Sequence, residues 1–90
     1  MFLIILFVIC MVSWAKDKQG KLKKEFTFSN YLKCFAFVSQ VAMLSEKKNH
    51  HPEIILDYGK VTISLISHDV QKITERDLEL ATQIDKIYSA

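Results

Sequence analysis

The stretch SNYLKCFAFVSQVAMLSEKKNHHP, residues 29–52, decides the fold. Its apolar side chains recur at helical spacing, which predicts an amphipathic helix over residues 31–48. Asn30 stands where an N-cap is expected. Because Pro52 cannot continue a helix, the chain must leave it at His50 and His51. The spacing assigns to the inward stripe Leu32, Phe35, Val38, Val41, Ala42 and Ser45.

Strand patterns lie on both sides of this helix. A turn closed by Gly20 separates strands expected at residues 12–16 and 21–28, and a tight turn at residues 58–60 separates strands expected at 54–58 and 61–67. In the strand expected at 21–28, the side chains at even-numbered positions share one face and are apolar except for Lys24. Thr74 and Asp77 resemble a capping box that opens a last helix. That helix runs to about Tyr88, and we expect its inward residues to be Leu78, Ala81, Ile84 and either Ile87 or Tyr88.

The order strand, strand, helix, strand, strand, helix predicts an α+β fold. Short hairpin connections make the strands antiparallel, and such a sheet can carry its helices on one face. A chain of 90 residues forms one domain with a modest core, so we expect self-association to support it.

The apolar segment at residues 1–13 is separate from this domain, which we place at residues 14–90. It is too short for a transmembrane helix but resembles a secretory signal, with Ser13 and Ala15 beside a cleavage site. No Lys or Arg precedes the apolar run, however. The alternatives are an element packed on the core or on a partner subunit, and a misplaced start codon. Cleavage after Ala15 would remove Trp14.

The charge and the cysteine content argue against several classes of protein. The formal net charge of +2 is too small to imply a nucleic-acid partner, and the five lysines between residues 16 and 24 lack the aromatic platforms of a phosphate-binding strip. Cys10 and Cys34 have no CxxC spacing, and we predict that both are reduced and structural.

Three histidines are the candidates for chemistry. His50 and His51 end the long helix, His68 ends a strand, and an imidazole exchanges protons near neutral pH. They suit acid–base catalysis, metal binding or a pH switch. Zinc is disfavoured because adjacent histidines in extended backbone point to opposite sides. Carboxylates that could orient the imidazoles are Glu46, Asp57, Asp69 and Asp77.

The spacing of these residues resembles the signature of the pterin-4a-carbinolamine dehydratases. Three residues separate Glu46 from His50-His51-Pro52, five more lead to Tyr58, nine to His68 and eight to Asp77. The resemblance covers roughly residues 14–87. It implies a four-stranded antiparallel sheet with two or three helices on one face, and assembly as a homodimer or homotetramer.

The resemblance also implies a reaction. Members of this family are hydro-lyases that convert 4a-hydroxytetrahydrobiopterin to quinonoid dihydropterin without a metal or organic cofactor, and so recycle tetrahydrobiopterin for an aromatic amino acid hydroxylase. We expect a cytoplasmic enzyme without nucleic-acid or membrane contact, unless residues 1–15 act as a signal.

Catalytic roles carried over from the resemblance fall on His50, His51 and His68. His50 and His68 are expected to form the acid–base pair, whereas His51 chiefly binds the pterin. Tyr58 and Asp77 are expected to be scaffold. The other substrate-binding residues expected are Glu46, Trp14 and Asp69.

Two departures from the family matter. The segment at residues 1–13 replaces a polar helix, and Lys72 stands where the family commonly has glycine. A positive φ at lysine would cost about 1–2 kcal/mol, so that loop is expected to differ. The competing functions are a non-catalytic interaction module, in which the helix at residues 31–48 serves as dimerisation cofactor of a transcription factor, and a truncated copy of the enzyme.

Overall fold

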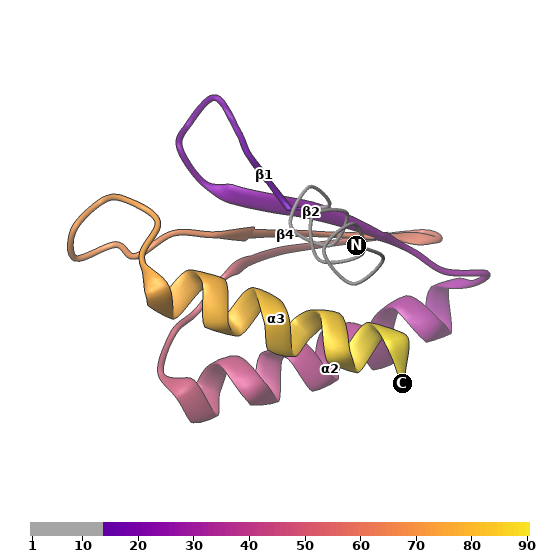
Figure 1. Cartoon of the computed structure of the whole chain (residues 1–90). Coiled ribbons are helices and arrows are strands. Elements are labelled where there is room, and N and C mark those ends of the chain that lie inside the picture. The colour runs from indigo at the N-terminus through magenta and orange to yellow at the C-terminus, as the bar shows by residue number, and fades with distance from the viewer. Residues whose placement is uncertain (1–13) are drawn as a thin grey trace, which may run out of the picture.

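The computed structural model of the chain describes residues 14–90 (Figure 1). The expected segment at residues 1–13, with Cys10 and the start of the first strand, lies outside the described residues. The elements in chain order are β1 (Ala15–Lys16), β2 (Leu22–Thr27), α2 (Tyr31–Lys48), β3 (Glu53–Asp57), β4 (Lys60–Leu65) and α3 (Glu75–Ser89).

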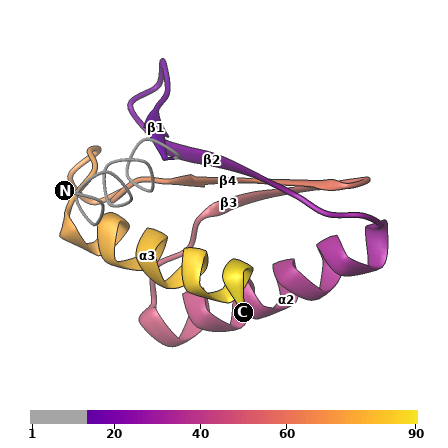
Figure 2. The same cartoon turned by 45° about the vertical axis from the view of Figure 1, so that its right-hand side comes forward.

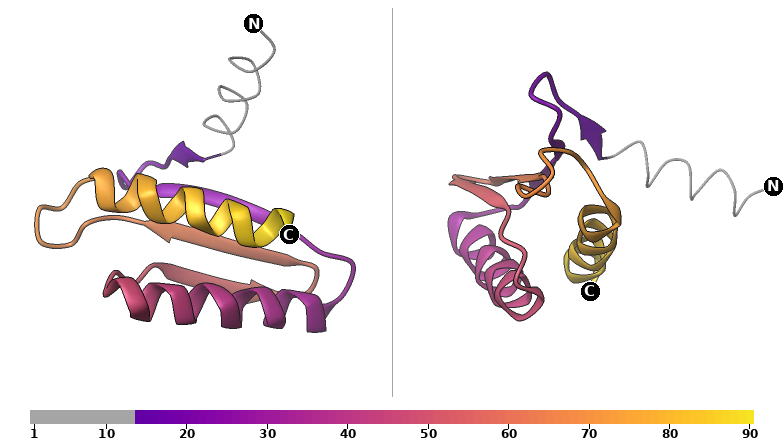
Figure 3. Two further views of the ribbon diagram at one scale, coloured as in Figure 1. Left: turned by 60° about the horizontal axis from the view of Figure 1, so that its bottom comes forward. Right: turned by 90° about the vertical axis from the view of Figure 1, so that its left-hand side faces the viewer.

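The four strands form one antiparallel sheet in the order β1-β2-β4-β3. Both helices cover the same face of this sheet, α2 alongside α3 (Figures 2 and 3). The predicted α+β class is therefore confirmed, with two helices in the described part of the chain. Gly59 makes the β3–β4 turn at a φ of +72°, a conformation that glycine adopts without strain.

The core lies between the sheet and the two helices. Phe26 of β2 is its centre, with ring centroids of Phe37 and Tyr88 at 4.9 and 5.0 Å. Cys34 is fully buried in the core, as expected of a structural residue, and it forms no disulfide with any residue of the range 14–90. The other apolar residues of the core are Trp14, Leu22, Val41, Val61, Ile63, Leu65, Leu80, Ala81 and Ile84.

Lys24 interrupts the apolar parity of β2 for a reason that the structure makes plain. Its Nζ lies 2.8 Å from the Asp85 carboxylate on α3 and 4.9 Å from the centroid of the Phe26 ring. The indole N–H of Trp14 donates to the same carboxylate at 3.0 Å. A charged group can face a core when a partner neutralises it, and here the pair ties the sheet to the last helix.

The predicted inward faces of the two helices are partly wrong. On α2, Val41 and Ser45 are buried as expected, but Leu32 and Phe35 are 74% and 54% exposed. Ala42 is exposed too. The helix is apolar on two faces, and helical spacing alone does not say which of them meets the sheet. Cys34 and Phe37 take the inward positions on α2.

The inward face of α3 is also shifted by two residues at its start. Leu78 is 41% exposed, and Leu80 is buried in its place, together with Ala81 and Ile84. The reason lies one residue earlier, because Asp77 is fully buried and its hydrogen bonds set the rotation of the helix.

Candidate active site

His50 is placed by the way α2 ends. Asn49 adopts the left-handed conformation, with a φ of 52°, and its N–H donates to the Glu46 carbonyl. The N–H of His50 donates to the Ser45 carbonyl at 3.0 Å. This arrangement satisfies carbonyls that the helix would otherwise leave unpaired, and it turns the chain sharply before Pro52. The His50 side chain is thereby aimed at the start of α3.

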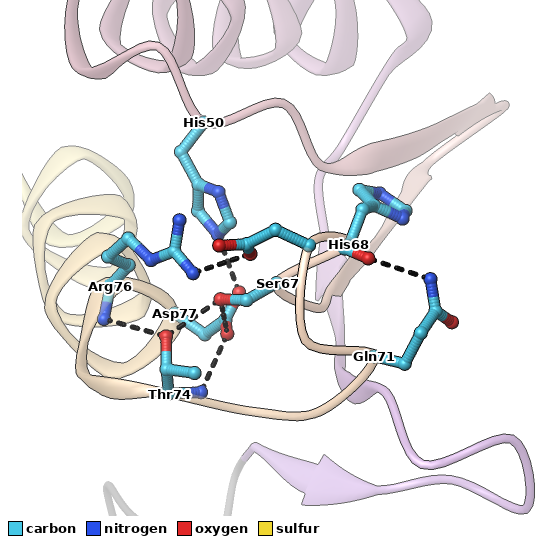
Figure 4. Close-up of polar contacts among 8 residues, drawn as sticks. His50, Ser67, His68, Gln71, Thr74, Arg76 and Asp77 are labelled. Atoms are coloured by element: carbon cyan, nitrogen blue, oxygen red, sulfur yellow. Dashed lines mark hydrogen bonds and ion pairs between the residues drawn. The ribbon is translucent and has the colours of Figure 1, made fainter.

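A buried carboxylate receives His50. The Nε2 atom of His50 lies 2.6 Å from Oδ1 of Asp77, whose side chain is fully buried. Oδ2 of Asp77 accepts from the Ser67 hydroxyl at 2.8 Å and from the Thr74 N–H at 2.9 Å. Figure 4 shows these three partners converging on Asp77. The capping box predicted for Thr74 and Asp77 is therefore confirmed.

The carboxyl group of Asp77 is held in its charged form. Burial alone would raise the pKa of Asp77, but hydrogen bonds from the Thr74 N–H, His50 and Ser67 outweigh it and lower that pKa below 3.8. An ionised carboxylate only accepts hydrogen bonds, so Nε2 of His50 is the donor in this contact. Nδ1 is the ring nitrogen that Asp77 leaves available for other partners.

Asp77 has two structural roles, and the sequence allowed for both. The same carboxylate caps α3, as expected of a scaffold residue, and contacts His50, as expected of a carboxylate that could orient an imidazole. Its four-residue i to i+3 capping pattern explains the first role. The second depends on α2 and α3 meeting in space, which no spacing along the chain reveals.

His68 follows directly after one of the partners of Asp77. Ser67 is fully buried, and its hydroxyl binds Asp77 and lies 2.7 Å from the Thr74 hydroxyl. His68 itself is exposed, and its carbonyl accepts from the Gln71 side chain at 2.8 Å. The segments that carry His50 and His68 are therefore held by a single carboxylate, as Figure 4 shows.

The loop after His68 differs from the expectation based on Lys72. Gln71 has the positive φ, +56°, whereas Lys72 does not belong to the residues with positive φ. The Lys72 carbonyl accepts from the Ser67 N–H at 3.1 Å, and so closes the loop. The residue with the left-handed backbone is therefore Gln71, one position before the lysine at which the strain was predicted.

His51 points to a different partner from His50. Its Nε2 atom lies 2.7 Å from Oε2 of Glu46, and both side chains are exposed. Adjacent histidines thus take separate carboxylates, as expected for extended backbone. Among residues 14–90, no group of three or more His, Cys, Asp or Glu side chains converges as a metal site would require.

The other expected substrate contacts are spread over the molecule. Asp69 pairs with Arg76 at 2.6 Å, and this hydrogen bond lowers the pKa of the Asp69 carboxyl. Trp14 is buried in the core and bound to Asp85. Tyr58 lies exposed at the β3–β4 hairpin, in keeping with a scaffold position. The roles of Asp69 and Trp14 toward a substrate stay predictions.

A cavity of about 200 Å³ opens beside His50, between the end of α2 and the first half of α3. Leu80 contributes an apolar wall. Sequence reasoning missed the polar residues on the α3 side, although their spacing is that of one helix face. The lining residues are Lys48, Asn49, His50, Arg76, Glu79, Leu80 and Gln83.

An antiparallel sheet with two helices on one face, and an Asp–His pair beside a cavity, define a small α+β protein with a candidate acid–base centre. The family model described as "Pterin 4 alpha carbinolamine dehydratase" matches residues 8–87. The chain therefore belongs to this family.

Relatives from Prochlorococcus marinus support this membership. A protein of strain NATL2A is 46% identical over 78 residues, which are 87% of this chain and 81% of the relative. A protein of strain MIT 9312 is 44% identical over 81 residues, 90% of this chain and 83% of the relative. The names of both assign them, provisionally, as pterin-4-alpha-carbinolamine dehydratases.

Two solved structures share the fold. One is a transcriptional coactivator/pterin dehydratase from Brucella melitensis, with a TM-score of 0.82 and 28% identity, covering 94% of this chain and 92% of that one. The other is a pterin dehydratase-like RuBisCO assembly factor of the alpha-carboxysome, with a TM-score of 0.74 and 28% identity, covering 87% and 92%. The fold thus serves proteins with different described roles.

Proposed function

We propose that this protein is a 4a-hydroxytetrahydrobiopterin dehydratase that works by histidine acid–base catalysis. The observation that carries the proposal is the fully buried Asp77 carboxylate, which binds His50 directly and the segment of His68 through Ser67. A carboxylate that only capped α3 would not need a histidine as a further partner. The family of the chain supports the same activity.

The proposed reaction removes one molecule of water from the pterin. One imidazole gives a proton to the C4a hydroxyl, which leaves as water, and another takes the proton from N5 as the C4a–N5 double bond forms. His50 and His68 fill these two roles in the proposal, and each transfer contributes about 10²–10⁴-fold in rate. Asp77 holds the His50 ring in one tautomer and orientation. His51 with Glu46, and also Trp14 and Asp69, are proposed to contact the substrate.

The test is the rate of dehydration of 4a-hydroxytetrahydrobiopterin by the purified chain. We expect His50→Ala and His68→Ala each to lose most of the rate and the double variant to reach the uncatalysed rate. Tyr58→Phe, at the exposed hairpin, is the control and should keep wild-type activity. Wild-type protein no faster than the uncatalysed reaction would contradict the proposal, and inhibition by a chelator would favour a metal mechanism instead.

A second proposed function is that of an interaction module, as a homodimer, a homotetramer or a dimerisation cofactor. The outward face of α2 favours it, because large apolar side chains stand exposed there at helical spacing. These residues are Tyr31, Leu32, Phe35 and Met43. Light scattering should show an oligomer for wild type and a smaller species for Phe35→Ala. A monomeric wild type would contradict the proposal that this face of α2 mediates self-association.

We place the activity in the cytoplasm, beside an aromatic amino acid hydroxylase that uses the recycled pterin. Among residues 14–90, no helix has the length and hydropathy needed to cross a bilayer. Mass spectrometry of the mature N-terminus decides the location: a chain that begins at Lys16 would mean export.

A further inference from the structure

The imidazole ring of His68 has no side-chain partner in the described part of the chain. Within residues 14–90 this ring takes part in no hydrogen bond or ion pair, whereas the rings of His50 and His51 each bind a carboxylate. His68 is also exposed, in a loop that follows the last strand. The place of its ring therefore depends on how the backbone on either side of it is held.

Two neighbouring residues of α3 hold the chain on both sides of His68. Before the histidine, the Ser67 hydroxyl donates to Asp77 at 2.8 Å. After the histidine, the Asp69 carboxylate accepts from the Arg76 guanidinium at 2.6 Å. Consecutive positions of the helix thus bind the residues directly before and directly after the histidine, and the segment is fixed at two points (Figure 4).

The two contacts differ in what they do for the fold. Ser67 and Asp77 are fully buried, whereas the side chains of Arg76 and Asp69 are 51% and 64% exposed. An exposed ion pair contributes little to the stability of a fold. A hydrogen bond between a rigid, planar guanidinium and a carboxylate is nevertheless directional. The Arg76–Asp69 pair is therefore suited to orienting the loop rather than to stabilising the domain.

We propose that Arg76 is a positioning residue for His68 and acts through its ion pair with Asp69. The inference rests on the proposed function, in which His68 exchanges a proton with the pterin. Proton transfer depends on geometry, and a misplacement of about 1 Å costs about 10²-fold in rate. Without Arg76, the chain after the histidine is held only by the turns of its own loop, one of which contains the positive φ of Gln71.

The experiment measures kcat and KM for dehydration of 4a-hydroxytetrahydrobiopterin by the full chain. We expect Arg76→Gln to lower kcat by about ten- to a hundred-fold and to change KM far less, with a denaturation midpoint close to that of wild type. Arg76→Lys should keep more of kcat, because an ammonium still pairs with Asp69 but lacks the planar fork. Lys86→Gln is the control, since it removes an exposed positive charge from the same helix.

Two further measurements show whether Arg76 acts through the histidine. In a His68→Ala background, Arg76→Gln should cause no further loss from the residual rate, because the ring that Arg76 positions is already gone. In proton NMR spectra without substrate, the ring signals of His68 should shift in Arg76→Gln, while those of His51 stay where they are in wild type.

The outcomes separate this inference from the proposed function. With active wild type, three results for Arg76→Gln overturn the role of Arg76 and leave the dehydratase: an unchanged kcat, a rise in KM alone, or a further loss in the His68→Ala background. Unfolded Arg76→Gln protein would contradict the argument that the pair orients rather than stabilises. Unmoved ring signals of His68 overturn the positioning role without any turnover assay, whereas inactive wild type overturns the proposed function itself.

Discussion

At the scale of single residues, Asp77 connects stability with the candidate chemistry. The Asp77→Asn variant keeps the size of the side chain but loses the charge that His50, Ser67 and Thr74 surround. We expect it to lower the free energy of unfolding by about 1.5–3 kcal/mol at neutral pH, the range for hydrogen bonds to a charged group. Chemical denaturation measures the change, with Asp57→Asn on the exposed hairpin as control.

The same variant predicts a pH dependence. The pKa of Asp77 is lowered in the folded protein, so the unfolded chain binds the proton more readily. The stabilisation by this carboxylate is therefore complete above the ordinary value of 3.8 and is lost as the pH falls through the lower, folded value. The difference in stability between wild type and Asp77→Asn should shrink in acid. A difference that grows as the pH falls would contradict this assignment.

Gln71 offers a second residue-scale prediction. It adopts a φ of +56°, where a side chain costs about 1 kcal/mol relative to glycine. Gln71→Gly should therefore raise the melting temperature slightly, although it also removes the hydrogen bond to the His68 carbonyl. Lys72→Gly is the control and should only destabilise, because the backbone there has no positive φ to relieve. Equal effects of the two variants would contradict the observed loop conformation.

At the scale of elements, α2 separates a buried face from an exposed one through two phenylalanines. Phe37 is buried against Phe26 and Phe28, whereas Phe35 is half exposed. We expect Phe37→Ala to cost about 3–5 kcal/mol of unfolding free energy and Phe35→Ala to cost far less. Denaturation at low protein concentration makes the comparison, because dissociated chains report the fold alone. A larger loss for Phe35→Ala than for Phe37→Ala would contradict the structure, because it would mean that the Phe35 face of α2 packs against the sheet.

The same helix shows how much of the fold the sequence contains. Its bounds, residues 31–48, are predicted correctly because Asn30 caps one end and Asn49 with Pro52 stops the other. β2, β3 and β4 agree with the predicted strands within one or two residues, since alternation and the two glycine turns mark them. β1 begins three residues after the predicted start, of which residues 12 and 13 lie outside the described range. The inward faces of the helices are predicted less well. Apolar residues occupy both faces of α2, and only the packing of the sheet chooses between them.

The candidate site, like the fold, is predicted by the sequence only in part. The histidines and their carboxylates share a short motif, so sequence reasoning reaches them. The contact of His50 with Asp77 spans 27 positions, and the link from Ser67 to Asp77 exists only once the strand end meets α3. Arg76 and Glu79 stay hidden for the same reason, because their cavity requires the end of α2 as its other wall.

At the scale of the whole molecule, one ion pair joins the start and the end of the described chain. Asp85 on α3 binds Lys24 of β2 and the indole of Trp14. Asp85→Ala should leave a half-buried ammonium without its partner and destabilise the fold by about 3 kcal/mol. The double variant Lys24→Met with Asp85→Leu should recover most of that loss. A double variant as unstable as the single one would contradict the account.

This contact has an optical consequence. Trp14 is the sole tryptophan of the chain, and its ring is 7% exposed, so its emission reports whether the first strand is seated on the last helix. Unfolding should shift that emission to the red as the indole meets water. A red shift that comes before the loss of helical structure would therefore reveal that the segment of Trp14 separates from α3 while the rest of the fold is intact.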